Sequence, residues 1–378
     1  MLQRLRTFLR WYRFYLRNTG ETACPGTFIA EVTYHCPLGC AMCSLHAGKT
    51  GGAPPRKETE ELDAEAWSSV FAQYAHMGGR NVLITGGEPT VRRDLPELVK
   101  AAARGGLRPH LLTSGYYLDE ELAEHLCREG VASWHLSLDG PDCVHNAIRG
   151  REDAFERMTR ALECLRQATA RRGGRAQIVL QCTVTARNQG HLADTLRVAT
   201  ELAADTLIFS HHSFVEPDVF CAEAQTARGE NWKLAPELRD VDPEILRREV
   251  REVDSMRSQL PRVEWSPRLA PDEIARWYQD PEFAVVSRCF YPWQGVSVGA
   301  YGDVFVCPMS PCAGNVQQDS LAALVNGPGL RRFRQTVARA GILTGCQKCC
   351  NLRNRLWRWI PSRPRRGRRS KAPGGVNE

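Results

Sequence analysis

The chain of 378 residues is 43% hydrophobic and 25% charged, which is typical of a globular protein and excludes a wholly disordered one. It has no apolar run of about 18 residues and no secretory signal, so we expect neither a transmembrane helix nor export, and predict a cytoplasmic protein. The net charge of +7 comes from the ends, where residues 1–20 carry +5 and residues 351–378 carry +8; the body is acidic, so we expect no nucleic-acid partner.

Residues 1–17 have the pattern of an amphipathic helix. Apolar and aromatic side chains, Tyr15 and Leu16 among them, recur on one face, and four arginines lie beside them. We favour a helix that packs against the rest of the fold. The alternative is a helix on an anionic membrane surface, where arginine and aromatic side chains are also typical. The basic segment 353–378, which we expect to be disordered, adds to the hypothesis of peripheral contact with the inner face of the membrane.

From residue 27 to about residue 210, strand-like and helix-like segments alternate. This alternation predicts a parallel sheet with right-handed crossovers. Six units fall short of the eight that close a full barrel, so we predict a partial (β/α)6 TIM-like barrel with its ligands at the carboxyl ends of the strands. The predicted strands are 27–34, 81–85, 108–113, 133–138, 177–185 and 205–210, and the predicted helices are 59–78, 94–105, 118–129, 152–171 and 190–203.

Three cysteines, Cys36, Cys40 and Cys43, lie within eight residues directly after the first predicted strand. Such a group can hold zinc or an iron–sulfur cluster. Structural zinc usually has four ligands in two separated pairs, and neither His35 nor His46 has a spacing that requires it as a fourth ligand. Cysteine thiolates are the usual ligands of iron–sulfur clusters, and three of them leave one iron of a four-iron cluster open. The spacing therefore favours the cluster.

The ends of the next four predicted strands carry short polar or glycine-rich motifs. They are "TGGEP" at 85–89, "TSG" at 113–115, "SLDG" at 137–140 with "HNAIRG" following at 145–150, and "TVTARN" at 183–188. Together with the Cys-x3-Cys-x2-Cys loop, they resemble the radical S-adenosylmethionine (SAM) superfamily over residues 27–210. The resemblance implies an enzyme in which a [4Fe-4S] cluster on the three cysteines binds SAM. It also implies reductive cleavage of SAM to a 5′-deoxyadenosyl radical that takes a hydrogen atom from the substrate.

The resemblance further implies which residues contact SAM. The turn at 85–89 and the Glu88 carboxylate would hold the amino group, which suits a carboxylate at a strand end. Arg149 would pair with the SAM carboxylate, and the end of the fifth strand would contact the ribose. One residue departs from the family pattern, because Met42 stands where an aromatic residue is usual. The implied SAM contacts are Gly86, Gly87, Glu88, Pro89, Ser114, Ser137, Asp139, Arg149, Thr183 and Asn188.

A second group of cysteines lies in the turn-rich segment 289–350, which also contains a predicted hairpin of strands 295–300 and 303–307. Its spacing resembles the SPASM auxiliary-cluster domain, but the pattern stops after Cys349. The resemblance is therefore to the shortened, twitch-type form, which is also found in radical SAM aminocyclitol dehydrogenases. A structural zinc site is the alternative. The implied ligands of this second iron–sulfur cluster are Cys289, Cys307, Cys346 and Cys349, with Cys312 and Cys350 as substitutes.

The remaining candidate residues are His211 and His212, which follow the sixth predicted strand. Each could contact substrate or move protons, and the alternative for each is an ordinary, satisfied loop histidine. The segment between the barrel and the second cysteine group has helical stretches near 242–258 and 271–279. The expected domains are an amphipathic helix at 1–20, a radical SAM barrel core at 21–215, a linker and helical region at 216–288, a SPASM/twitch-like domain at 289–352 and a basic tail at 353–378.

These features predict a radical SAM enzyme with an auxiliary cluster and a low-potential electron donor of the flavodoxin or ferredoxin kind; whether it is an oxidoreductase or a transferase stays open. The main hypothesis for the substrate is a sugar- or aminocyclitol-like small molecule, because the cysteine pattern is shortened. A ribosomal peptide is an alternative, although only 35 residues precede Cys36. A lipid or polyprenyl substrate at the membrane surface is another. A non-enzymatic metal-binding module is the alternative class, and the SAM-type motifs argue against it.

Overall fold

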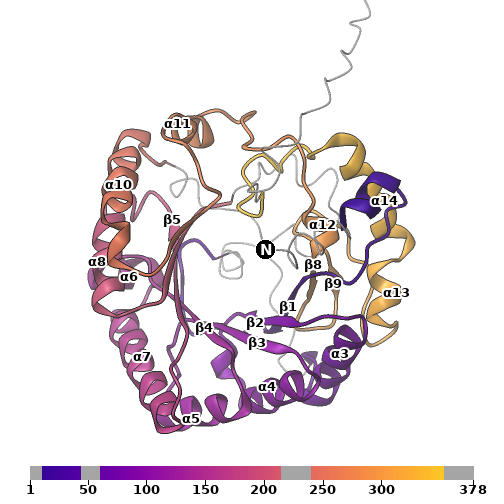
Figure 1. Cartoon of the computed structure of the whole chain (residues 1–378), viewed down its shortest axis with the longest axis horizontal. Coiled ribbons are helices and arrows are strands. Elements are labelled where there is room, and N and C mark those ends of the chain that lie inside the picture. The colour runs from indigo at the N-terminus through magenta and orange to yellow at the C-terminus, as the bar shows by residue number, and fades with distance from the viewer. Residues whose placement is uncertain (1–10, 44–59, 214–239, 353–378) are drawn as a thin grey trace, which may run out of the picture.

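One curved sheet organises the molecule. The computed structural model describes residues 11–43, 60–213 and 240–352, and within them nine strands follow the order β7-β6-β5-β4-β3-β2-β1-β8-β9. All neighbouring strands run parallel except β8 and β9. The sheet curves around an open centre, and helices cover its outer side (Figure 1). The predicted parallel, open barrel is confirmed.

The six predicted strands and the five predicted helices are present with bounds close to those expected, and one further helix, after the fourth strand, was not predicted. α3 starts later than predicted because Asp63 caps it, its carboxylate accepting the Ala66 N–H at 2.8 Å. The strands are β1 (Thr27–Thr33), β2 (Asn81–Gly86), β3 (Arg108–Thr113), β4 (Ser133–Ser137), β5 (Ile178–Val184) and β6 (Thr206–His211). The helices between them are α3 (Ala64–His76), α4 (Leu95–Arg104), α5 (Glu120–Glu129), α6 (Asp142–Arg149), α7 (Ala154–Arg171) and α8 (Leu192–Glu201), with a 3-10 turn, η3 (Pro89–Val91), after β2.

Three further strands extend the sheet on both sides. β7 (Val263–Ser266) pairs with β6, and β8 (Gly295–Val298) pairs with β1 before the chain turns back as β9 (Val304–Phe305). The predicted hairpin is therefore present, and its strands belong to the sheet of the barrel. The segment that carries the second cysteine group is thus continuous with the barrel. The predicted helical stretches appear as α10 (Pro243–Met256), with a short η6 (Arg257–Gln259), and α11 (Pro271–Gln279). The expectation of a turn-rich end is wrong in part, since it contains α12 (Tyr291–Gln294), α13 (Leu321–Val325) and α14 (Pro328–Ala340).

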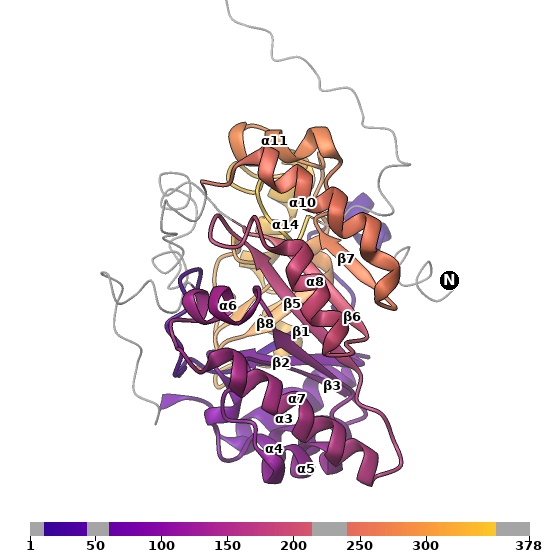
Figure 2. The ribbon, with the colours of Figure 1, turned by 90° about the vertical axis from the view of Figure 1, so that its left-hand side faces the viewer.

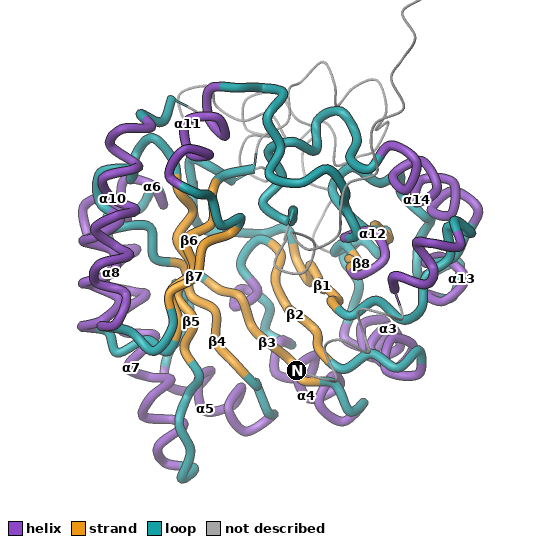
Figure 3. Tube along the Cα trace, turned by 45° about the horizontal axis from the view of Figure 1, so that its top comes forward, coloured by secondary structure: helices purple, strands orange, loops and turns teal. Residues whose placement is uncertain are grey.

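The main core lies between the sheet and the outer helices. Alternate residues of β1, such as Phe28 and Val32, are fully buried on this side, and Phe28 packs its ring 4.7 Å from that of Tyr74 on α3. Figure 2 shows the side of the barrel that α8 and α10 cover, and in Figure 3 the loops gather beyond the ends of the strands. None of the described helices is both long enough and apolar enough to cross a membrane.

The described part of the N-terminal helix, residues 11–17, packs against the C-terminal segment. Tyr15 is only 7% exposed, and its ring lies 4.4 Å from that of Phe290 and 5.3 Å from that of Trp293. Its hydroxyl donates to the Ala338 carbonyl at 3.3 Å. Leu16, which was expected on the apolar face, is 61% exposed. This part of the helix agrees with the packed interpretation; residues 1–10 lie outside the described residues, so membrane contact stays a prediction.

Replacing Tyr15 with leucine is expected to lower the free energy of unfolding by about 1.5 kcal/mol, because a hydrogen bond and two aromatic contacts are lost. The matched change Leu16→Ala, on the neighbouring exposed residue, should alter it by less than about 0.5 kcal/mol. Denaturant unfolding of the anaerobic protein measures both. Equal effects of the two substitutions would show that this part of the helix is not packed on the C-terminal segment.

Candidate functional site

The turn after β2 is hydrogen-bonded to the segment that leads into the first cysteine. The Gly87 N–H donates to the Thr33 carbonyl at 2.7 Å, and the Glu88 N–H donates to the His35 carbonyl at 2.8 Å. Gly86 has a φ of +136°, and a Cβ atom there would lie 2.1 Å from the Thr33 oxygen. At Gly87 a Cβ atom would lie 2.3 Å from the His35 oxygen. Glycine at both positions is therefore what allows the two predicted motifs to meet.

The loop with the first three cysteines is held from its other side by the end of α6. The Gly39 N–H donates to the Arg149 carbonyl at 3.1 Å, and the Ala41 N–H donates to the Ile148 carbonyl at 3.0 Å. Gly150 ends α6 with a φ of +69°, and a Cβ atom there would come within 2.9 Å of the Gly39 oxygen. The motif that follows β4 thus lies directly against the loop that follows β1.

Cys36, Cys40 and Cys43 pack in one cluster with Tyr116. Burial raises the pKa of the Cys36 thiol to about 12, and the neighbouring Glu88, Cys40 and Cys43 add to the rise. Buried thiols that oppose one another's ionisation stay neutral unless metal cations stabilise their thiolates, and the irons of a cluster are such cations, so this donor set fits an iron–sulfur cluster. Among the described residues, no three His, Cys, Asp or Glu side chains converge closely enough to surround a single metal ion.

The Glu88 carboxylate is buried and receives five hydrogen bonds. Two come from Thr90, two from Ser114 at 2.7 and 2.5 Å, and one from the Thr113 hydroxyl at 2.5 Å. All five donors are neutral, and Glu88 forms no ion pair with a lysine or arginine of the described residues. A buried carboxylate fixed in this way is suited to bind an ammonium group, as the SAM resemblance implies. The sequence analysis missed Thr90 and Thr113, although Thr113 opens the "TSG" motif that it singled out.

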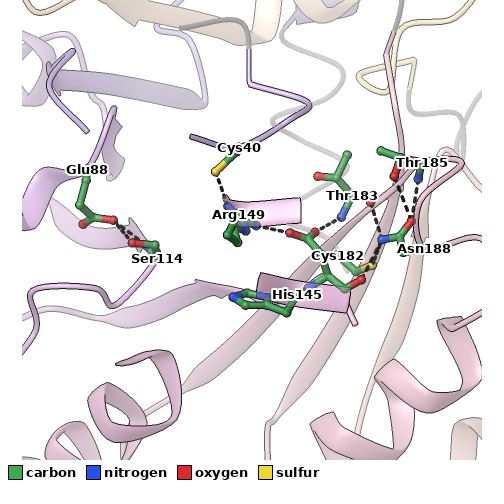
Figure 4. A network of polar contacts seen from close by, with 10 residues as sticks. Cys40, Glu88, Ser114, His145, Arg149, Cys182, Thr183, Thr185 and Asn188 are labelled. Atoms are coloured by element: carbon green, nitrogen blue, oxygen red, sulfur yellow. Dashed lines mark hydrogen bonds and ion pairs between the residues drawn. The ribbon is translucent and has the colours of Figure 1, made fainter. Parts of the chain in front are cut away.

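Asp139 and Arg149 form a buried ion pair, and Arg149 lies beside Cys40 of the cysteine loop (Figure 4). Arg149 Nη2 lies 2.6 Å from Asp139 Oδ2, and Nη1 donates to Cys40 Sγ at 3.6 Å. Burial by itself would lower the pKa of Arg149, but Asp139 and Cys40 outweigh it and the pKa is raised. Arg149 Nε has no hydrogen-bond partner among the described residues. The predicted pairing of Arg149 with the SAM carboxylate therefore stays a prediction, for which the Nε–H is an available donor.

The residues expected to contact the ribose already have partners within the protein. The Asn188 side chain accepts the Thr185 N–H at 2.8 Å and donates to the carbonyls of Asp139 and Thr183, both at 2.9 Å. The Thr183 N–H donates to Asp139 Oδ1 at 3.0 Å. A ribose contact by the Asn188 amide would have to replace one of these bonds, so its role in binding SAM, and those of Thr183 and Ser137, stay predictions.

The structure brings the four predicted auxiliary ligands together. Burial raises the pKa of Cys289 to about 12 and also raises that of Cys307, and Cys346 adds to the rise of both. The pKa of Cys349 is also raised by burial, then by Cys350, the possible substitute ligand, and further by Cys289 and Cys346. Cys312 is exposed and stands apart from this group. The ligand set stays a prediction, and the donor chemistry fits a second cluster for the same reason as the first.

The last cysteine loop is fixed by residues that the sequence analysis did not single out. Lys348, between Cys346 and Cys349, is buried and donates to the carbonyls of Asp280 at 2.6 Å and Phe283 at 2.9 Å. The one feature of the sequence that could have indicated its role is its position between the two cysteines of a Cys-x2-Cys pair. Cys350 is tied to the barrel, since its N–H donates to the Ser213 hydroxyl at 2.7 Å.

His211 has the surroundings of a structural residue. It is buried, its Nδ1 lies 2.8 Å from the Tyr278 hydroxyl, and its ring stacks on Trp265. Burial lowers its pKa to about 3, which leaves the ring neutral at ordinary pH. These contacts favour the alternative of a satisfied histidine. His212 is partly buried, with Nδ1 2.7 Å from the Ser213 carbonyl, and its candidate role stays a prediction.

Two protein families match the chain. Residues 30–195 match the Radical SAM superfamily, and residues 289–350 match SPASM, an iron–sulfur cluster-binding domain. The first match spans the cysteine loop and the polar network around Glu88 and Arg149. The second runs from Cys289 to Cys350 and includes all four predicted auxiliary ligands.

Curated relatives match about half of the chain. A PqqA peptide cyclase of Rhizobium meliloti (strain 1021) is 34% identical over 186 residues, which are 48% of this chain and 45% of the relative. A PqqA peptide cyclase of Gluconobacter oxydans (strain 621H) is 31% identical over 191 residues, 50% of each chain. The chain thus spans about half the length of the curated relatives it matches.

Solved structures with a similar fold match more of the chain at lower identity. Streptococcus suis SuiB bound to the precursor peptide SuiA is 14% identical, covers 86% of this chain and 70% of that one, and gives a TM-score of 0.62. Native anSMEcpe with bound AdoMet is 18% identical, covers 82% of each chain, and gives a TM-score of 0.56. At these identities the similarity shows a shared fold.

Proposed function

We propose that this chain, which belongs to the radical SAM superfamily and carries a C-terminal iron–sulfur cluster-binding SPASM domain, modifies a peptide substrate. The observation that carries the proposal is the pair of curated relatives, both named peptide cyclases and both more than 30% identical to about half of the chain. Their names favour a peptide over the sugar- or aminocyclitol-like molecule that the shortened cysteine pattern suggested.

The cofactors of this family are SAM, the [4Fe-4S] cluster that binds it and the additional iron–sulfur cluster of the SPASM domain. When bound, they supply a 5′-deoxyadenosyl radical that takes a hydrogen atom from the substrate, together with a second site for electron transfer. Cys36, Cys40 and Cys43 would hold the first cluster, and Cys289, Cys307, Cys346 and Cys349 would hold the second.

The protein's own residues bind and orient SAM at the strand ends. The Glu88 carboxylate, fixed by Ser114 and Thr113, would receive the SAM ammonium group, because it is buried and has no cationic partner among the described residues. The Asp139–Arg149 pair lies against the cysteine loop and would keep Arg149 in place for the SAM carboxylate. The backbone of Glu88 and that of Arg149 are both hydrogen-bonded to the segment that carries the first three cysteines, which supports binding in one orientation.

The experiment is to supply candidate peptides to the reconstituted protein. Peptides encoded by short reading frames beside the gene are incubated anaerobically with SAM and a low-potential donor such as flavodoxin. We expect one of them to lose two hydrogen atoms, as an intramolecular cross-link requires, while 5′-deoxyadenosine forms. Mass spectrometry of the peptide measures this. If the protein instead converts a sugar or a lipid made by the products of neighbouring genes, and leaves every peptide unchanged, the proposal is contradicted.

A further inference from the structure

Arg334 of α14 is a buried cation that none of the preceding roles explains. Its side chain is fully buried. Nε donates to the Pro292 carbonyl at 2.7 Å, and Nη1 donates to the carbonyls of Val325 at 2.8 Å and Gly20 at 3.1 Å. Nη2 has no hydrogen-bond partner among the described residues, and within them the guanidinium forms no ion pair with a carboxylate.

Burying a charge in this way is unfavourable unless an anion lies near it. Carbonyl oxygens accept three of the hydrogen bonds, but they carry no net charge and so do not neutralise the guanidinium. A neutral side chain could form hydrogen bonds to the same segments. Burial lowers the pKa of Arg334 to about 10, and Cys307 is the neighbour that opposes this shift. The neighbour whose thiolate form would favour the Arg334 cation is thus one of the predicted cluster ligands.

The surroundings of Arg334 place it among the segments that supply these ligands. Pro292, which accepts the Nε–H, follows Cys289 by three residues. Phe333, the preceding residue on α14, packs in the same small cluster around Met309 as Cys307 and Cys346. The side chain therefore lies where the chain stretches that carry three of the four predicted auxiliary thiols meet α14.

We propose that Arg334 is a charge-compensating residue of the auxiliary cluster, whose buried guanidinium offsets the negative charge of a cluster held by Cys289, Cys307, Cys346 and Cys349 and raises its reduction potential. A cluster with four thiolate ligands becomes more negative by one charge when it accepts one electron from a low-potential donor. A fixed cation in a poorly solvated site stabilises this reduced form more than the oxidised form. The inference rests on the proposed ligand set.

The test compares two charge-removing substitutions on the same helix. Arg334→Gln removes the buried cation, and Arg331→Gln removes an exposed one that pairs with Glu21 at 3.0 Å. Both are made in the full chain with Cys36, Cys40 and Cys43 replaced by alanine, so that the auxiliary cluster is the one observed. Reductive titration followed by electron paramagnetic resonance measures its potential. We expect Arg334→Gln to lower the equilibrium constant for reduction about tenfold, or ~59 mV for one electron, and Arg331→Gln to leave it near the parent value.

Iron analysis separates failure of the ligand set from failure of this inference. A parent chain without about four irons in this background would overturn the ligand set, and the inference with it. If the cluster is present and the two variants have the same reduction potential, Arg334 has no electrostatic role. If Arg334→Gln holds no cluster, Arg334→Lys decides: retention of the cluster at the parent potential supports the role of the charge, whereas its loss shows that the hydrogen bonds alone matter.

Discussion

Replacing Cys36, Cys40 and Cys43 together with alanine is expected to halve the iron of the reconstituted protein, from about eight to about four atoms per chain, and to abolish SAM cleavage. The three thiols lie in one buried cluster, and Cys36 is influenced by both of the others. The second group of thiols is carried by separate segments from Cys289 onward, so its cluster should persist. Iron analysis and detection of 5′-deoxyadenosine, both under anaerobic conditions, measure the two effects.

A matched control replaces three cysteines outside both groups, Cys127, Cys143 and Cys164, which lie on α5, α6 and α7. This variant should keep about eight irons and parental SAM cleavage. SAM cleavage by the first variant, or an equal loss of iron from the control, would contradict the assignment of the first cluster. Zinc in place of the remaining iron would overturn the assignment of the second cluster.

Replacing Glu88 with glutamine is expected to weaken SAM binding at least tenfold. The neutral amide cannot pair with the SAM ammonium group, and a charge-assisted hydrogen bond contributes about 1.5–3 kcal/mol. The substitution keeps the shape of the side chain, but its amide nitrogen would also face donors from Thr113 or Ser114. Equilibrium dialysis with labelled SAM, on protein that carries both clusters, measures the affinity.

The control for this change is Glu249→Gln. Glu249 is also buried, and its carboxylate accepts the N–H groups of Leu192 and Ala193 at the start of α8, away from the cysteine loop. This variant is expected to lose some folding stability, but its SAM affinity should match the parent's. Parental affinity in Glu88→Gln would show that the carboxylate does not bind SAM. Arg149→Ala is a poorer test, because it strands the buried Asp139 without its partner.

Much of the site could be predicted from sequence because parallel strands bring their carboxyl ends to one edge of the sheet. This rule alone places the cysteine loop after β1, Glu88 after β2 and Ser114 after β3 near one another, and Ser114 indeed binds Glu88. It says nothing about which side chains satisfy each other. The pairing of Arg149 with Asp139 and the saturation of the Asn188 amide depend on tertiary contacts that strand order does not determine.

The C-terminal segment was the hardest to predict. Its glycines, prolines and cysteines suggested turns, and they concealed α14, in which the apolar Leu330 and Val337 are buried while several arginines are exposed. Nothing in the local pattern shows that β8 pairs with β1, because strand partners far apart in sequence are chosen by packing. A local pattern also places an arginine on the surface by default, so the burial of Arg334 could not be foreseen.

The most direct test of a radical SAM enzyme that acts on a peptide is to follow hydrogen from the peptide to SAM-derived product. The peptide that the protein modifies is prepared with deuterium at its carbon-bound positions and incubated anaerobically with SAM and reductant. We predict that mass spectrometry will find deuterium in 5′-deoxyadenosine, formed in step with the modified peptide. Unlabelled 5′-deoxyadenosine in the presence of a fully modified, deuterated peptide would contradict hydrogen-atom abstraction from the peptide.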